Sequence, residues 1–242
     1  MLPTLLLCLI ALFAGFTQGL AGFGSVLVAL PLMALLLDLQ TAVPLAGLWG
    51  MSINIILLVT LRRHLSLKRI WPLAAAAVPG IPFGVYTLVS VPVWIMEMVL
   101  GGVLVVFSVY FALSGGGTRN LARGWAYCAG FTSGFLGGSL AASGPPVIIY
   151  TALQPWPKDE IKSTLTGFFF LSGLIILAAQ AAGGLITSRV LSLGLYSLPF
   201  IFLGVFLGSW CYDKLDSQRY RQVVVGLITL LGLLTLAKAL GW

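Results

Sequence analysis

Long apolar stretches separated by short polar breaks run along the whole chain. The pattern predicts apolar segments near residues 2–37, 41–61, 70–90, 93–113, 125–153, 161–186, 190–212 and 220–240. Because about 20 apolar residues cross a bilayer as a helix, all but the first and fifth of these segments have an ordinary spanning length.

The first and fifth segments are too long for a single crossing. As one helix, residues 2–37 would measure roughly 54 Å, whereas the hydrocarbon core of a bilayer is about 30 Å thick. Glycine interrupts both segments, at Gly19, Gly22 and Gly24 in the first and at Gly134, Gly137 and Gly138 in the second. Since closely spaced glycines weaken a helix and permit a sharp reversal, each segment is predicted to break into two shorter helices. Pro31 and Pro146 fall in or near the second piece of each.

The two broken segments are also related in sequence. The run Ala-Gly-Phe-Thr-Gln-Gly-Leu-Ala-Gly at 14–22 returns as Ala-Gly-Phe-Thr-Ser-Gly-Phe-Leu-Gly at 129–137. Further matches follow in the same order, Gly47 with Gly167, Gly80/Gly84 with Gly204/Gly208, and Gly101 with Gly226. The echo predicts two homologous transmembrane repeats, 1–115 and 122–242, which is a common plan among secondary transporters.

Composition and charge place the chain in the membrane and suggest an orientation. Apolar residues make up 60% of the 242 residues and charged residues only 8%, which leaves no room for a large extramembrane domain. The net charge of +7 resides mainly in short loops, so it indicates topology rather than nucleic-acid binding. Basic loops at 62–69, 114–124 and 213–221 are expected in the cytoplasm. The two halves would then be inverted, with each long segment either re-entrant or crossing twice.

The broken segments carry the candidate chemistry. Non-helical backbone within a bilayer is tolerated where it lines a cavity, and the N–H groups that begin a half-helix favour an anion. Hydroxyl and amide side chains beside them would complete a neutral cradle for an oxyanion. The predicted substrate-binding residues are Thr17, Gln18, Gly22, Gly24, Ser25, Asn54, Thr132, Ser133, Gly137, Gly138, Ser139 and Ser143.

Each of these predictions has a structural alternative. Glycines can serve close helix packing alone, and this interpretation is preferred for Gly80/Gly84, Gly204/Gly208 and Gly101/Gly102. A helix–helix hydrogen bond accounts for Asn54 as well as a cavity position does. Enzyme motifs are absent from the sequence, with no P-loop, no HExxH and a single histidine, so no catalytic, cofactor or metal residue is predicted. The cysteines, Cys8, Cys128 and Cys211, are interpreted as packing residues.

Two motifs resemble those of a known family of membrane proteins. They are Gly-Leu-Ala-Gly-Phe-Gly at 19–24 and Gly-Gly-Ser-Leu-Ala-Ala-Ser-Gly-Pro-Pro at 137–146, and the basic loop at 62–69 accompanies them. With these features in this order, essentially the whole chain resembles the TauE/SafE family of membrane permeases. The resemblance implies transport of small, often sulfur-containing anions such as sulfite or organosulfonates. Many members carry more glycine in the first motif, where this chain has Ser25 and Val26, so fine selectivity is not carried over.

The resulting hypothesis is an all-α, multi-pass transporter of the bacterial inner membrane, built from two inverted repeats. It would export a small anion by alternating access around the two glycine-rich breaks. The alternatives are an anion channel or a membrane scaffold that transports nothing. Expected partners are the anionic substrate and the lipid bilayer, with no nucleic acid. A coupling ion, either a proton or sodium, and a homodimer are further hypotheses that the sequence leaves open.

Overall fold

Helices form all the secondary structure that is described. The computed structural model describes residues 2–21, 23–61, 65–113 and 121–212, with 229–230, 232–233, 236–237 and 240 near the C-terminus. In chain order the helices are α1 (Leu2–Ala21), α2 (Ser25–Ala34), α3 (Leu39–Leu61), α4 (Leu67–Ser90), α5 (Val93–Leu113), α6 (Arg123–Leu140), α7 (Gly144–Leu153), α8 (Lys158–Ala182) and α9 (Ser188–Tyr212). Because lipid offers no hydrogen-bond partners, helices are the natural solution for such apolar segments.

The ordinary spanning segments appear where the hydropathy pattern predicts them. Helices long and apolar enough to cross a membrane are Leu39–Val59, Leu67–Ser90, Ser163–Ala182 and Ser188–Cys211. Shorter apolar helices cover Leu5–Leu20, Ser25–Ala34, Trp94–Val106 and Gly144–Leu153. The prediction of an all-α, multi-pass membrane protein is therefore confirmed. The predicted segment at 220–240 lies largely outside the described residues.

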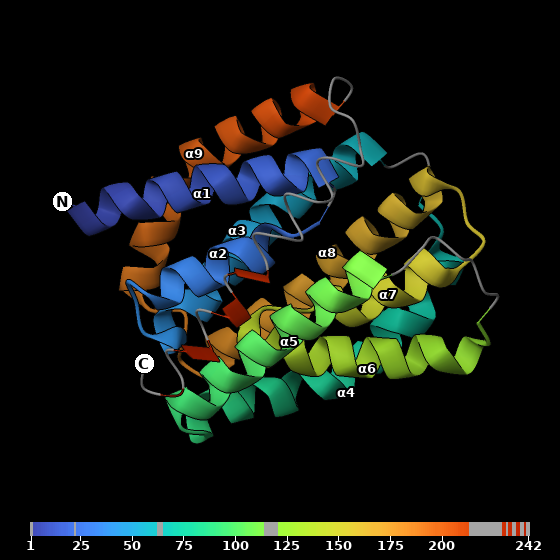
Figure 1. Ribbon diagram of the computed structural model, residues 1–242, viewed down its shortest axis with the longest axis horizontal. Helices are drawn as coiled ribbons and strands as arrows, with labels where there is room; N and C mark the ends of the chain where they lie inside the picture. The colour runs from blue at the N-terminus through green and yellow to red at the C-terminus, as the bar shows by residue number, and fades with distance from the viewer. Residues whose placement is uncertain are drawn as a thin grey trace.

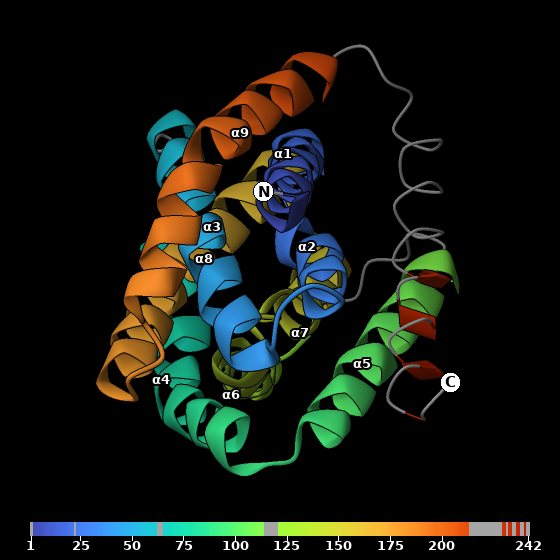
Figure 2. The same cartoon turned by 90° about the vertical axis from the view of Figure 1, so that its left-hand side faces the viewer.

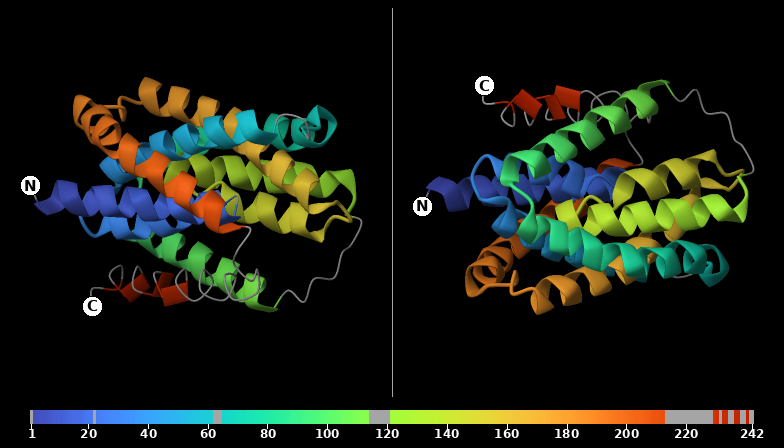
Figure 3. Two further views of the ribbon diagram at one scale, coloured as in Figure 1. Left: turned by 90° about the horizontal axis from the view of Figure 1, so that it is seen from above. Right: turned by 90° about the horizontal axis from the view of Figure 1, so that it is seen from below.

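Both long segments fold into helical hairpins. Helix α1 runs inward from the end of the bundle that carries the N-terminus, and α2 returns toward that end (Figure 1). Helices α6 and α7 do the same from the opposite end, as the views from above and below also show (Figure 3). The two hairpins thus enter from opposite ends of the bundle, and their turns lie within it.

The second break lies further along the chain than the glycines indicate. The first falls at residues 22–24, within the predicted glycine run, but the second falls at 141–143. The predicted break at Gly134, Gly137 and Gly138 is therefore wrong, because all three are helical and belong to α6. A Cβ on Gly134 would overlap the carbonyl oxygen of Ala77, and one on Gly138 that of Ile81. These two glycines permit close packing of α6 on α4, which offsets their weak helix propensity.

Two tightly packed helix pairs organise the bundle, and we call them the glycine seams. In the α1–α9 seam, Cβ atoms added to Gly15, Gly19, Gly204 or Gly208 would overlap a backbone carbonyl oxygen of the partner helix. The α4–α6 seam has the same character at Gly80, Gly84, Gly130, Gly134 and Gly138. Each seam joins the first helix of one predicted half to the fourth helix of the other. The packing role inferred for Gly80/Gly84 and Gly204/Gly208 agrees with these contacts.

The short helices α2 and α7 lie inside the bundle, with α1, α3, α6 and α8 around them (Figure 2). Most of α2 is buried, including Leu27, Val28, Leu30 and Met33. Helix α5 stands at the edge, where Gly101 faces Leu236 and Gly232 of the C-terminal segment. The centre of the molecule is thus formed by the two hairpin turns and the helices that enclose them.

Candidate functional site

A cavity of about 70 Å³ lies where the two hairpin turns meet. It is lined by Gln18, Phe23, Gly24, Ser25, Val26, Leu27, Ala46, Gly47, Gly50, Met51, Asn54, Ala141, Ala142, Ser143, Gly144, Ile148, Phe169, Gly173 and Ile176. Residues from both breaks contribute, and α3 and α8 supply the remaining walls. Since a water needs about 10–15 Å³ of such space, the cavity has room for a small group of polar atoms. We call it the central cavity.

Backbone geometry at the two breaks shows why the helices stop there. Gly24 has φ of +99°, a left-handed conformation that glycine adopts readily and other residues rarely do. At the second break Ala141 has φ of +52°, and two hydrogen bonds to carbonyl groups of α6 close the end of that helix. The N–H of Ala141 donates to Gly137 O at 3.0 Å and that of Ala142 to Leu136 O at 3.1 Å. This is the left-handed cap of many helix C-termini, here with alanine in place of the usual glycine.

The N-terminus of α2 supplies hydrogen-bond donors to the cavity. No side chain caps this helix, and its first intrahelical donor is Val28, whose N–H bonds to Gly24 O at 3.2 Å. The N–H groups of residues 25–27 precede that bond, and these residues line the cavity. Helix α7 also begins at the cavity without a side-chain cap, but Pro145 and Pro146 have no N–H to offer. Of the two half-helices, α2 is therefore the richer in donors.

A chain of polar side chains forms one wall of the cavity. The hydroxyl of Ser25 donates to Gln18 Oε1, and Gln18 Nε2 donates to Asn54 Oδ1 at 3.1 Å. All three residues are buried, and they come from α2, α1 and α3. With Oδ1 used as an acceptor, the Asn54 amide still has its two Nδ2 hydrogens to donate. Among the described residues, no Lys, Arg, Asp, Glu or His lines the cavity. An anion bound there would be held by neutral donors and helix dipoles.

The second break contributes two of the predicted serines in different ways. Ser143 lines the cavity, and its carbonyl oxygen accepts a hydrogen bond from the hydroxyl of Ser133. Ser133 itself is fully buried and ties α6 to the turn that follows it. Gly137 faces the same turn, since a Cβ there would lie 2.7 Å from Ile176 Cδ1 and 3.0 Å from Ser143 Cβ. Ser133 and Gly137 therefore support the cavity without lining it.

Other predicted residues are not among those that line the central cavity. Thr17 donates to Phe13 O and Ser139 to Phe135 O, each at 2.8 Å within its own helix. Thr132 is exposed, donates to Cys128 O at 2.9 Å and lines a separate apolar groove between α6 and α7. Gly138 packs on α4, and Gly22 lies outside the described residues. Gln18, Gly24, Ser25, Asn54 and Ser143 are thus the predicted residues that the structure brings together.

Most of the α3 and α8 walls of the central cavity carry no signal that was used in the sequence predictions. On α3 the lining residues Ala46, Gly47, Gly50, Met51 and Asn54 recur at helical spacing, so they share one face. On α8 the lining residues are Phe169, Gly173 and Ile176. The repeat of Gly47 at Gly167 was visible in the sequence, but the glycine stripe around Asn54 was the better signal for this wall.

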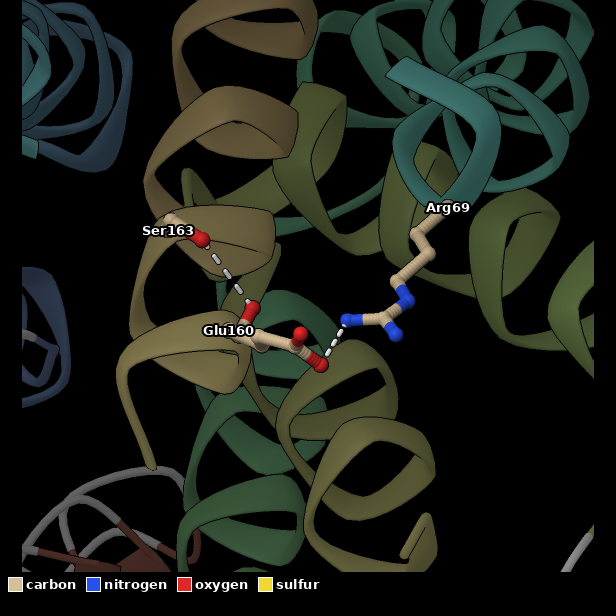
Figure 4. A network of polar contacts seen from close by, with 3 residues as sticks. All are labelled: Arg69, Glu160 and Ser163. Atoms are coloured by element: carbon tan, nitrogen blue, oxygen red, sulfur yellow. Dashed lines mark hydrogen bonds and ion pairs between the residues drawn. The ribbon is translucent and has the colours of Figure 1, made fainter. Parts of the chain in front are cut away.

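A separate polar cluster ties helices together at the end of the bundle opposite the N-terminus. Arg69, near the start of α4, forms an ion pair with Glu160 in the first turn of α8 (Figure 4). The guanidinium of Arg69 also lies 4.6 Å from the ring centroid of Trp156, and Trp156 meets Tyr150 edge-on at 6.2 Å. None of these residues lines the central cavity, so the cluster belongs to the bundle's end rather than to the site. Among the described residues, no group of His, Cys, Asp and Glu could hold a metal ion.

The long apolar helices and the paired hairpins around the central cavity define a multi-pass membrane protein. A family model described as sulfite exporter TauE/SafE matches residues 7–235, nearly the whole chain. The chain belongs to this family, whose members are membrane transporters of sulfite and related anions rather than enzymes. No curated protein and no solved structure matches the chain.

Proposed function

We propose that this protein is a secondary transporter of the bacterial inner membrane that exports small oxyanions, with sulfite or organosulfonates as its main substrates. The observation that carries the proposal is the central cavity itself. It joins both helix breaks and contains neutral hydrogen-bond donors, and none of the described residues that line it is charged. Family membership supports the sulfur oxyanion class.

The chemistry of the cavity suits an anion that must be both bound and released. The N–H groups of residues 25–27, the Asn54 amide and the Ser143 hydroxyl are all neutral donors at or facing the site. Hydrogen bonds from neutral donors are weaker than those from Arg or Lys, so binding should be modest and release easy. A compact, trigonal or tetrahedral oxyanion head matches the small volume better than a sugar or an extended amine does.

The glycine seams suggest how access could alternate. One seam fastens the α1–α2 hairpin to α9, and the other fastens the α6–α7 hairpin to α4. We propose that 1–115 and 122–242 are inverted repeats, and that the two fastened units rock about the cavity between them. Each unit holds one helix break, so a relative rotation would open the cavity first to one end and then to the other.

Counterflow in liposomes tests the proposal directly. Purified protein would be reconstituted and loaded with unlabelled sulfite or methanesulfonate, and uptake of the labelled anion would be followed. Saturable counterflow, absent with an amine or a neutral sugar, is the expected result. Electrical currents with weak saturation would favour a channel instead, and no response to any oxyanion would refute the proposal. Imposed proton or sodium gradients in the same vesicles would identify a coupling ion.

A further inference from the structure

Gln180 continues the cavity-lining face of α8 beyond the cavity. Phe169, Gly173 and Ile176 line the central cavity, and Gln180 follows Ile176 at the spacing that keeps side chains on one helical face. Its side chain has a relative exposure of 0%. This amide therefore lies inside the bundle, about one helical turn from the cavity wall.

The amide of Gln180 makes no hydrogen bond with any described residue. Both Nε2 and Oε1 are buried without a partner. The other buried amides are paired, since Gln18 bonds to Asn54 and Gln154 Nε2 donates to Leu121 O at 3.5 Å. An unpaired buried polar group costs about 1–3 kcal/mol, and one in a native structure calls for an explanation.

A glycine of α3 lies beside both this amide and the central cavity. Gly47 of α3 lines the cavity, and a Cβ placed on it would lie 3.5 Å from Gln180 Oε1 and 3.3 Å from Leu177 Cδ2. Any larger residue at Gly47 would stand between the cavity and the amide. Helix α3 begins, and α8 ends, toward the end of the bundle that carries the N-terminus (Figure 1), and Gln180 belongs to the last turn of α8.

We propose that Gln180 is a second binding position on the substrate path, between the central cavity and the end of the bundle that carries the N-terminus. The proposal rests on the transport function proposed above. Gln180 Nε2 has two donor hydrogens, which suit the oxygens of sulfite or a sulfonate head, and it adds no charge that would trap the anion. A small separation of α3 from α8 would admit the anion past Gly47.

Measuring both stability and transport distinguishes an amide that binds substrate from one that is only buried without a partner. Gln180→Leu removes the polar atoms while filling a similar volume. Thr164→Val is the matched control, because Thr164 Oγ1 is also buried and unpaired on α8 but lies toward the opposite end of that helix. Thermal unfolding in detergent and sulfite counterflow in liposomes would be measured for both variants. We expect both to unfold at a higher temperature than the unmodified protein, because each loses an unsatisfied buried group.

Transport should distinguish the two variants. Gln180→Leu should lower the maximal rate of sulfite counterflow at least fivefold, whereas Thr164→Val should leave it unchanged. A more stable Gln180→Leu protein with an unaltered rate would overturn the role of Gln180 alone. If Gln180→Leu does not fold, Gln180→Met tests the same point, and failure of both to fold would show a structural role and overturn the proposal too. An unmodified protein that moves no oxyanion would instead refute the transport function itself.

Discussion

Gln18 Nε2 and Asn54 Oδ1 are joined by a 3.1 Å hydrogen bond that links the end of α1 to the middle of α3. The bond fixes the Asn54 amide so that its oxygen is occupied and its Nδ2 hydrogens remain as donors. It also positions Gln18 Oε1 to accept a hydrogen bond from the hydroxyl of Ser25 on α2. Three helices thereby hold one polar wall of the central cavity in a single arrangement.

The first prediction concerns this wall. Replacing Asn54 with Leu should raise the half-saturation concentration for sulfite about fivefold, because a lost neutral hydrogen bond costs about 1 kcal/mol. The measurement is counterflow over a range of sulfite concentrations in liposomes. A double-mutant cycle with Gln18→Leu should show coupling, since both changes remove the same bond. Strictly additive effects would show that the two amides act independently.

The second prediction compares two serines of the second hairpin. Ser143 lines the central cavity, whereas the Ser139 hydroxyl is bonded to Phe135 O within α6. Ser143→Ala should therefore raise the half-saturation concentration several-fold, on the order of 1 kcal/mol of lost binding, and Ser139→Ala should not. Sulfite counterflow by the two purified variants provides the comparison. Equal effects of both changes would place the anion elsewhere.

The third prediction concerns the α4–α6 seam and uses two glycines of the same helix. A Cβ on Gly134 would overlap the Ala77 carbonyl oxygen, but one on Gly124 would meet nothing within 4 Å. Gly134→Ala should therefore cost about 1–3 kcal/mol of stability through overpacking. Gly124→Ala should be neutral or slightly stabilising, because alanine is the better helix former. Thermal unfolding of both variants in detergent tests this, and a Gly134→Ala protein of unchanged stability would contradict the seam.

The fourth prediction concerns the ion pair at the opposite end of the bundle. Glu160→Gln and Arg69→Gln should each lower thermal stability by at most about 1 kcal/mol, because both side chains are partly exposed. Exchange of the two charges in the double variant Arg69→Glu, Glu160→Arg should restore part of the loss. Arg69→Gln should be the more harmful single change, since it also removes the contact with Trp156. Equal stability of all four proteins would show that the pair contributes nothing.

The sequence predicted most of the helices because lipid leaves apolar segments little alternative. The first break was also located correctly, since Gly24 adopts a conformation that favours glycine. The second was misplaced for a physical reason. A glycine looks the same in the sequence whether it turns the chain or lets a neighbouring helix approach, and Gly134 and Gly138 do the latter. The residue that turns the chain is Ala141, which gives no such signal.

The residues that line the candidate site were predicted only in part, because the sequence does not show which face of a helix points into the bundle. Gln18, Ser25 and Asn54 meet at the cavity, but Thr132 is on the outer face of its helix. Which face of α6 points inward depends on its seam with α4, and this long-range contact is not encoded in the spacing of hydroxyl residues. The α8 wall escaped notice because Phe169 and Ile176 look like ordinary membrane residues until their neighbours are known.

The α1–α9 seam has a consequence for how the chain is made. Gly15 of α1 packs against the carbonyl of Ile201, and Gly204 of α9 packs against that of Leu12. At a synthesis rate of about 5–20 residues per second, α9 would emerge from the ribosome roughly 10–40 s after α1. For that time α1 has no docking partner. In that interval its glycine stripe must be sheltered by lipid, by the insertion machinery or by a neighbouring helix. Neither half can complete its packing alone, so two separately encoded halves should assemble only when both are synthesised in the same cell.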